Sequence, residues 1–166
     1  MPSTGAIVLV GPMGVGKTTI GKKLAKVLEL PFVDTDVLIA RKHGDIPKIF
    51  ATAGETKFRE FEEECVLEAI SLPGVVATGG GAVLSPQTRA ALTQTTVIYL
   101  STDGKHIATR LSGGNRPLLK DGLSDWRRIY ESRRELYEQV ADITVDTSRI
   151  ALKSIVESIV SELKRK

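Results

Sequence analysis

One eight-residue stretch, Gly11–Thr18, constrains this chain more than any other. Its sequence GPMGVGKT has the spacing G-x-x-x-x-G-K-[ST] of a phosphate-binding loop, in which backbone N–H groups turn inward around a polyphosphate. The apolar run Ala6–Val10 before it has the character of a strand, and the residues from Lys17 to Leu28 have helical spacing. The helix N-terminus adds a positive dipole end, the lysine reaches the outer phosphates, and the hydroxyl of Thr18 can ligate Mg²⁺. This strand, loop and helix therefore predict a site for a nucleoside triphosphate with Mg²⁺ rather than a glycine-rich turn that binds nothing.

The rest of the chain alternates between short apolar runs and helical patterns. Further strands are expected at 32–33, 75–78, 96–100 and 143–145, and further helices at 37–43, 47–51, 55–71, 86–92, 102–111, 124–140 and from 152 onward. This alternation predicts an α/β fold with three layers, in which a central five-stranded parallel sheet has helices on both faces. We expect Ser85 and Ser124 to cap helices, and Val27 and Leu152 to lie on buried helix faces.

Length and composition are those of an ordinary globular protein. The 166 residues suit one domain, 1–166, and 42% of them are apolar and 26% charged. No apolar run approaches the length of a membrane span, and we expect no secretory leader. The lone Cys65 cannot form an internal disulfide, which fits a reducing cytoplasm, and it shares a helix face with Phe58 and Phe61, as a core thiol would. The net charge is +3, but the basic residues are mostly scattered along the chain and no nucleic-acid-binding module accompanies them. We therefore expect neither nucleic acid nor membrane as a partner.

Polar and glycine-rich segments follow two of the expected strands. Asp34 and Asp36 alternate at the end of the second strand, and Gly79-Gly80-Gly81 follows the third. Ligands bind at the carboxyl edge of an open parallel sheet, and three consecutive glycines indicate that another group approaches the backbone closely. In phosphoryl transfer one aspartate could serve the metal and the other the attacking hydroxyl, although either could instead cap a helix. A water nucleophile would make the protein an ATPase.

Two segments have the character of additions that cover a site. Residues 35–61 are irregular, with short helical patterns broken at Gly44-Asp45, and we interpret them as a substrate-binding insertion. Residues 112–124 begin with glycines, carry Arg116 and lie between two expected helices, as a lid would. Both should move when ligands bind, because a phosphate donor has to be shielded from water.

Six motifs follow one another along the chain. They are the phosphate loop, Asp34-Thr35-Asp36, Phe58-Arg59-x-x-Glu62, Thr78-Gly79-Gly80-Gly81, Arg116-Pro117-Leu118-Leu119 and Arg133-x-x-Leu136-Tyr137. Their order and spacing resemble those of the shikimate kinases, small-molecule P-loop kinases of the nucleoside monophosphate kinase type. The phosphate loop alone is common to many families, but the six together are specific and span essentially the whole chain. The resemblance implies transfer of the γ-phosphate of ATP to the 3-hydroxyl of shikimate, with Mg²⁺ as cofactor.

The resemblance also implies roles for individual residues. The groups it implies in phosphoryl transfer are Lys17, Arg116 and Asp36, the last as a ligand of shikimate hydroxyls and a base. The shikimate contacts that it implies are Asp36, Arg59, Gly80, Gly81 and Arg133, with the two arginines gripping the carboxylate. It implies ATP contacts at Gly14, Val15, Gly16, Lys17, Thr18, Thr19, Arg110, Arg116 and Arg149, and Mg²⁺ at Thr18 and, through water, at Asp34. We expect a cytoplasmic monomer whose partners are ATP and shikimate.

The arginine assignment has independent physical support and two open points. Shikimate carries one carboxylate, and the planar donors of arginine match a carboxylate in a bidentate way. Without the family pattern, Arg59 would be interpreted as paired with a nearby glutamate and Arg133 as part of a solvated helix face. Glu135 stands where many relatives have proline, so Arg133 and Arg134 are both candidates for the inward position.

Three alternatives of different kinds remain. A related kinase such as gluconate kinase would share the phosphate loop, but it is not expected to combine Asp34-Thr35-Asp36 with the three glycines. A nucleotide-binding module without turnover would not need the full set of charged residues. A nucleic-acid-stimulated NTPase would show salt-sensitive binding to polynucleotides.

Overall fold

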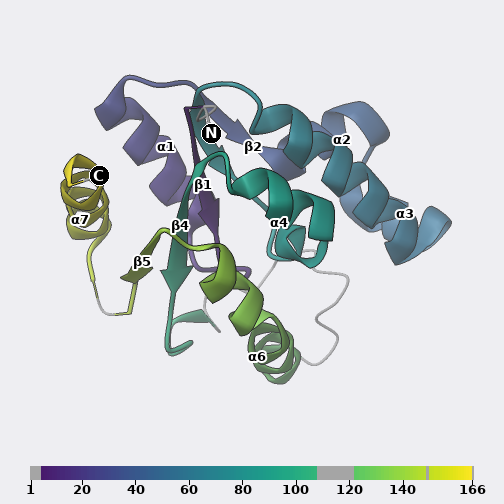
Figure 1. Ribbon diagram of the computed structural model, residues 1–166. Helices are drawn as coiled ribbons and strands as arrows, with labels where there is room; N and C mark the ends of the chain where they lie inside the picture. The colour runs from purple at the N-terminus through teal and green to yellow at the C-terminus, as the bar shows by residue number, and fades with distance from the viewer. Residues whose placement is uncertain (1–4, 108–121, 149, 166) are drawn as a thin grey trace.

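The computed structural model describes residues 5–107, 122–148 and 150–165. Five parallel strands form one sheet in the order β2-β3-β1-β4-β5 (Figure 1). The strands are β1 (Ala6–Val10), β2 (Phe32–Asp34), β3 (Gly74–Ala77), β4 (Thr96–Ser101) and β5 (Ile143–Asp146). The predicted five-stranded parallel sheet is therefore confirmed.

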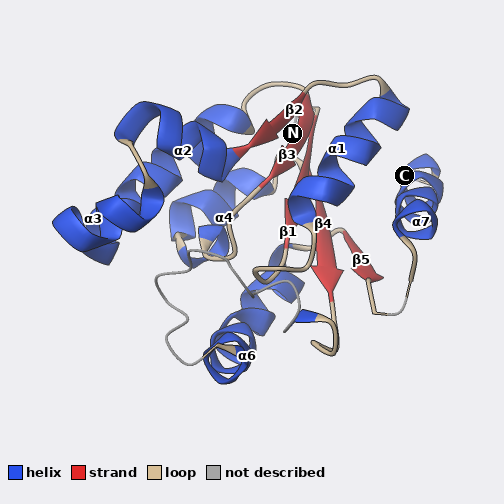
Figure 2. Ribbon diagram, turned by 180° about the vertical axis from the view of Figure 1, so that it is seen from behind, coloured by secondary structure: helices blue, strands red, loops and turns tan. Residues whose placement is uncertain are grey.

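Helices connect the strands and cover both faces of the sheet. The helices are α1 (Lys17–Leu28), α2 (Thr35–His43), α3 (Ile46–Ala69), α4 (Pro86–Leu92), α6 (Leu123–Val140) and α7 (Leu152–Lys164), and η1 (Ala82–Leu84) is a 3₁₀ turn. α1 and α7 pack on one face, whereas α4, α6 and part of α3 pack on the other (Figures 1 and 2). Parallel neighbours need crossover connections, and these helices supply them. The result is the predicted three-layer α/β arrangement.

Alternating side chains along the strands fill a core on each face. On β1, Val8 points toward α3, α4 and α6, whereas Leu9 points toward α1 and α7. Strands that are buried on both faces are apolar throughout, which explains why the runs in the sequence are continuous. A third, smaller cluster joins α2 to α3 and includes Phe58 and the free Cys65, which is fully buried. The prediction of a core thiol is therefore confirmed.

The segment predicted as a substrate-binding insertion contains one bent helix. α3 changes direction at Gly54, where φ is 86° and ψ is 169°. This backbone region is open essentially to glycine alone. The two expected helices at 47–51 and 55–71 are thus the arms of α3 on either side of Gly54.

α2 begins two residues earlier than expected. The side chain of Asp34 accepts hydrogen bonds from the backbone N–H groups of Asp36, at 2.9 Å, and Val37, at 3.4 Å, and so caps the helix. Asp36 therefore lies in the first turn of α2. The expectation that both aspartates alternate along a strand end was wrong, because the cap on Asp34 starts the helix at Thr35.

Helix ends and faces differ from the expectations at three positions. Ser85 caps α4 as predicted, since its Oγ accepts from the N–H of Thr88 at 3.1 Å. Ser124 does not cap α6, because the helix already begins at Leu123. Val27 is 51% exposed and Leu152 is 38% exposed, so both lie at the margin of their helices' buried faces.

Two further expectations concern residues that lie partly outside the described ranges. Residues 102–106 of the helix predicted at 102–111 are not helical, so the expected start of that helix was wrong, and its residues 108–111 lie outside the described ranges. Residues 112–121 of the predicted lid also lie outside them. No helix within the described ranges has both the length and the apolar character required to span a bilayer.

Candidate active site

A cleft of about 580 Å³ opens where β1, β2 and β3 end. The phosphate loop, α2, both arms of α3, the glycine turn 79–81 and α6 contribute to its walls. The predicted site residues that line it are Gly14, Gly16, Lys17, Thr18, Thr19, Asp34, Asp36, Arg59, Gly80, Gly81 and Arg133. Val15 is buried in the core between the sheet and α1 and anchors the loop. Arg110, Arg116 and Arg149 lie outside the described residues.

The phosphate loop owes its shape to glycines in left-handed conformations. Gly14 has φ 78° and Gly16 has φ 101°, values that side-chain-bearing residues rarely adopt. The Nζ of Lys17 donates hydrogen bonds to the backbone carbonyls of Gly11, at 2.6 Å, and Pro12, at 2.9 Å. The ammonium group thus lies across the mouth of the loop, at the place where a bound polyphosphate would need a positive charge.

A hydroxyl and a carboxylate stand side by side next to this loop. The Oγ1 of Thr18 donates to Oδ2 of Asp34 at 2.6 Å, while Oδ1 of the same carboxylate caps α2. Asp34 therefore caps a helix and still presents one oxygen to the cleft. Mg²⁺ is usually held by one or two protein oxygens together with water and substrate phosphates, so this pair fits that ion. In the part of the chain that the structure describes, no three His, Cys, Asp or Glu side chains form a metal-binding cluster.

A second acidic group lies deeper in the cleft. Burial, together with the charges of Asp34 and Glu62, raises the pKa of Asp36 to about 6, although Lys17 and Arg59 oppose this rise. A carboxyl group with such a pKa is ionised at neutral pH but is a better proton acceptor than an ordinary aspartate. Glu62 is only 4% exposed, and burial raises the pKa of its carboxyl group against the opposing effect of Arg59.

Arg59 on α3 is held by two glutamates of its own helix. Its Nη1 donates to Oε1 of the buried Glu62 at 2.8 Å, and its Nε and Nη2 each lie 3.3 Å from Oε2 of Glu55. The pairing of Arg59 with a nearby glutamate is therefore present, and the same guanidinium also lines the cleft.

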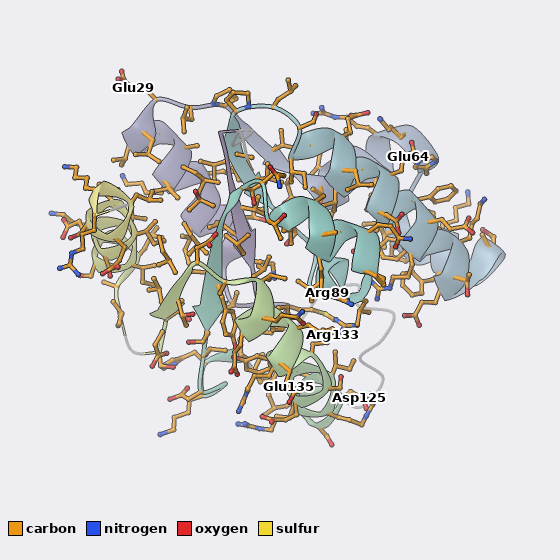
Figure 3. The ribbon with its side chains drawn as sticks, viewed as in Figure 1. Glu29, Glu64, Arg89, Asp125, Arg133 and Glu135 are labelled. Atoms are coloured by element: carbon orange, nitrogen blue, oxygen red, sulfur yellow. The ribbon has the colours of Figure 1, made fainter. Side chains whose placement is uncertain are left out.

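Arg133 and Arg134 have opposite surroundings on α6. Arg133 is 6% exposed and lines the cleft from the side of α6 that faces η1 (Figure 3). Arg134 is exposed, pairs with Glu131 and lies over the ring of Tyr130. The structure thus places Arg133 inward and Arg134 outward.

The glycine turn brings these charged groups together. A Cβ atom at Gly79 would lie 2.9 Å from Oδ1 of Asp36, and one at Gly81 would lie 2.1 Å from Nη1 of Arg59. A Cβ at Gly80 would lie 3.5 Å from Nη1 of Arg133. Three side chains from α2, α3 and α6 therefore approach a bare stretch of backbone, as the three consecutive glycines predicted.

Three residues of this region have surroundings that the sequence pattern does not predict. A nearby glutamate is expected to hold Arg59, but the burial of the Glu62 carboxylate in the cleft wall is not expected. Trp126 and Tyr137 have no predicted role in the site, and their polar atoms contact backbone 113 and 57 positions away. Spacing along the sequence carries no signal for such distant contacts.

A phosphate loop between the first strand and helix of a parallel sheet, facing a cleft with charged walls, defines a small-molecule kinase of the P-loop class. The family model described as shikimate kinase matches residues 13–164. A shikimate kinase of Mycobacterium avium is 45% identical over 162 residues, which are 94% of this chain and 92% of the relative. The chain belongs to the shikimate kinase family.

Solved structures agree with this assignment. The shikimate kinase from Acinetobacter baumannii, solved in complex with shikimate, has a TM-score of 0.92 at 37% identity, covering 97% of this chain and 93% of that one. A gluconokinase from Sinorhizobium meliloti has a TM-score of 0.68 at 20% identity, covering 99% and 94%, and this likeness shows the shared fold alone.

Proposed function

We propose that this protein transfers the γ-phosphate of ATP to the 3-hydroxyl of shikimate, giving shikimate 3-phosphate and ADP in the route to chorismate and the aromatic amino acids. The observation that carries the proposal is the convergence of Arg59, Arg133 and Asp36 on one glycine turn beside the phosphate loop. A small acid with several hydroxyls matches this set, because arginine pairs with carboxylates and a carboxylate accepts from hydroxyls.

The acceptor is held by side chains from three helices. Arg59 and Arg133 grip its carboxylate, and the backbone at Gly80 and Gly81 contacts it where no side chain intervenes. Asp36 accepts from its hydroxyls. Burial of Arg133 and of Glu62, the partner of Arg59, keeps the guanidinium groups oriented before the acid arrives.

The donor is held chiefly by backbone. ATP binds with its phosphates inside the loop 11–18, where Gly14, Val15 and Gly16 turn their N–H groups inward and Thr18 and Thr19 lie in the first turn of α1. Lys17 then exchanges the two backbone carbonyls for phosphate oxygens. Mg²⁺ supplies charge neutralisation at the β- and γ-phosphates, and Thr18 and, through water, Asp34 would hold it. Arg116 closes on the phosphates, and Arg110 and Arg149 contact adenine; these three assignments rest on the family resemblance.

Transfer needs one proton acceptor and an in-line approach. Asp36 takes the proton of the 3-hydroxyl of shikimate. The oxygen of that hydroxyl bonds to the γ-phosphorus, and the bond from this phosphorus to the β,γ-bridging oxygen breaks. The electron pair leaves with ADP. An Asp36 pKa of about 6 suits this task, because the carboxylate is ionised at pH 7 but still basic enough to accept a proton.

The direct test is an assay of ADP release by purified protein with ATP and Mg²⁺. Parallel reactions contain shikimate, gluconate, a nucleoside monophosphate or buffer alone, and we expect turnover with shikimate only. Lys17→Ala provides the inactive control and should lower kcat at least about a hundredfold, since a cation facing the transferred group is lost. Equal turnover with gluconate, or with buffer alone, would refute the proposed acceptor.

We extend the proposal to the state of the protein in the cell. We propose that the protein acts as a monomer and as a single domain, 1–166, with a substrate-binding insertion at 35–61 and a lid at 112–124. The free, buried Cys65 supports a cytoplasmic location.

A further inference from the structure

We propose that Trp126 and Tyr137 are positioning residues that tie the donor loop and the acceptor turn to one helix, α6. This inference rests on the proposed function, because it assigns one of these loops to ATP and the other to shikimate. Trp126 lies near the beginning of α6 and Tyr137 near its end, three turns apart. Both loops are thereby hydrogen-bonded to the same helix.

Tyr137 holds the acceptor turn. Its hydroxyl donates to the backbone carbonyl of Gly80 at 2.5 Å, and the side chain is 1% exposed. Glycine backbone is the most conformationally free, so a turn of three glycines needs an external contact to keep one orientation. Arg133 lies one helical turn before Tyr137, and the same face of α6 thus places the Gly80 peptide and the Arg133 guanidinium together.

Trp126 holds the donor loop. Its indole N–H donates to the backbone carbonyl of Met13 at 2.8 Å, and the side chain is 2% exposed. Met13 precedes Gly14 in the phosphate loop, and its backbone N lies 3.3 Å from where a Cβ of Gly80 would be. The two loops are therefore neighbours, and each has its own hydrogen bond to α6.

Tyr130 offers a matched control on the same helix. It is buried, and its hydroxyl is 2.6 Å from the hydroxyl of Tyr99, away from either loop. Its ring lies 5.2 Å from that of Trp126 and 6.1 Å from that of Tyr137, between centroids. Tyr130→Phe therefore removes a buried hydroxyl contact from the same aromatic cluster without touching the donor or acceptor backbone.

The experiment compares Tyr137→Phe, Trp126→Phe and Tyr130→Phe with the wild type, using the full chain. Steady-state KM values for ATP and for shikimate, kcat and the melting temperature are measured for each. We expect Tyr137→Phe to raise the KM for shikimate roughly three- to tenfold, the loss typical of one buried hydrogen bond, and to leave the KM for ATP within about twofold. Trp126→Phe should show the converse, and Tyr130→Phe should change neither KM while lowering the melting temperature by a similar amount.

The outcomes separate this inference from the proposed function. A wild type that does not phosphorylate shikimate refutes both. An active wild type with equal KM changes in all three variants overturns the positioning roles alone, since a purely structural contribution would affect them alike. If one variant does not fold, the other still decides, because each must shift the KM of its own substrate only.

Discussion

The two halves of the cleft are built by different means. The proposed donor half is one continuous stretch, Gly11–Thr18, in which three glycines with positive φ shape the backbone and Lys17 and Thr18 add their polar side chains. The acceptor half gathers Asp36, Arg59 and Arg133 from three helices around the glycine turn. The donor half thus lies in one local segment, whereas the acceptor half depends on side chains from three separate helices. Substitutions in the acceptor half should therefore affect shikimate and leave ATP nearly untouched.

The largest effect is expected from Asp36→Asn. Removing the base should lower kcat by roughly 10² to 10⁴, while the Kd for ATP changes little. Kinetics and nucleotide titration on the same preparation measure both quantities. A loss of ATP affinity as large as the loss of kcat would contradict the division into two halves.

The thermal stability of Asp36→Asn provides a control, and the raised pKa of Asp36 gives the direction of the expected change in melting temperature. Folding raises the pKa of Asp36 from 3.8 to about 6, so the folded state binds this proton more tightly than the unfolded state. The resulting stability is complete below pH 3.8 and is lost as the pH rises through 6. Asp36→Asn should therefore raise the melting temperature at pH 8 and change it little at pH 3.5. A lower melting temperature of Asp36→Asn at pH 8 would contradict the raised pKa of Asp36.

The next effect in size separates two adjacent arginines. Arg133→Ala should weaken shikimate binding by about 2–5 kcal/mol, because it removes one of two charges that face the substrate acid. Arg134→Ala is the matched control and should change it less than about twofold, since Arg134 is exposed and paired with Glu131. Calorimetric titration with shikimate measures both. Equal losses in the two variants would show that the helix face is misassigned.

The pH dependence should reveal the same carboxyl group in the free enzyme. As the pH falls through about 6, Asp36 takes up a proton and can no longer accept one, so kcat/KM should fall about tenfold for each further pH unit. Profiles of kcat/KM for shikimate between pH 5 and 8 test this. This fall in kcat/KM at acidic pH should be absent from the residual activity of Asp36→Asn. A fall that persists in the variant would report the titration of another group.

The smallest effect is expected at Glu55. Its carboxylate lies 3.3 Å from two nitrogens of Arg59, where the substrate carboxylate would have to bind, so Glu55→Gln should tighten shikimate binding by about twofold. Glu131→Gln removes a comparable exposed pair on α6 and should have no effect. Weaker shikimate binding in Glu55→Gln would instead make Glu55 a support of Arg59 in the bound state.

The contrast between a local donor segment and an acceptor half gathered from three helices also explains which parts of the structure the sequence predicts. The phosphate loop and the apolar strands are local patterns, and the structure has them where they were expected. The choice between Arg133 and Arg134 depends on how α6 is rotated against its neighbours, which Trp126 and Tyr137 fix through distant contacts. Asp36 was wrongly expected on the strand. After Asp34 the chain can either continue the strand or begin a helix capped by Asp34, and the hydrophobic pattern does not distinguish these two outcomes.

Val27 illustrates the remaining kind of error. Helical spacing groups it with the buried face of α1, yet it is 51% exposed. Periodicity gives the direction of a face but not its width, which depends on how far the neighbouring layer extends. The roles proposed for Arg110, Arg116 and Arg149 remain predictions from the family resemblance.

The bend in α3 has a consequence for the shape of the acceptor wall. A straight helix of its 24 residues would be about 36 Å long and could not curve around a small ligand. The bend lets Phe50 on one arm and Phe58 on the other line the same cavity. Apart from its own neighbours in the helix, no heavy atom lies within 4 Å of the place where a Cβ of Gly54 would be, so an alanine there would be strained by the positive φ and not by contact with another part of the chain. An alanine at position 54, which does not itself line the cleft, would therefore change the angle between the two arms of α3 and with it the shape of the acceptor wall.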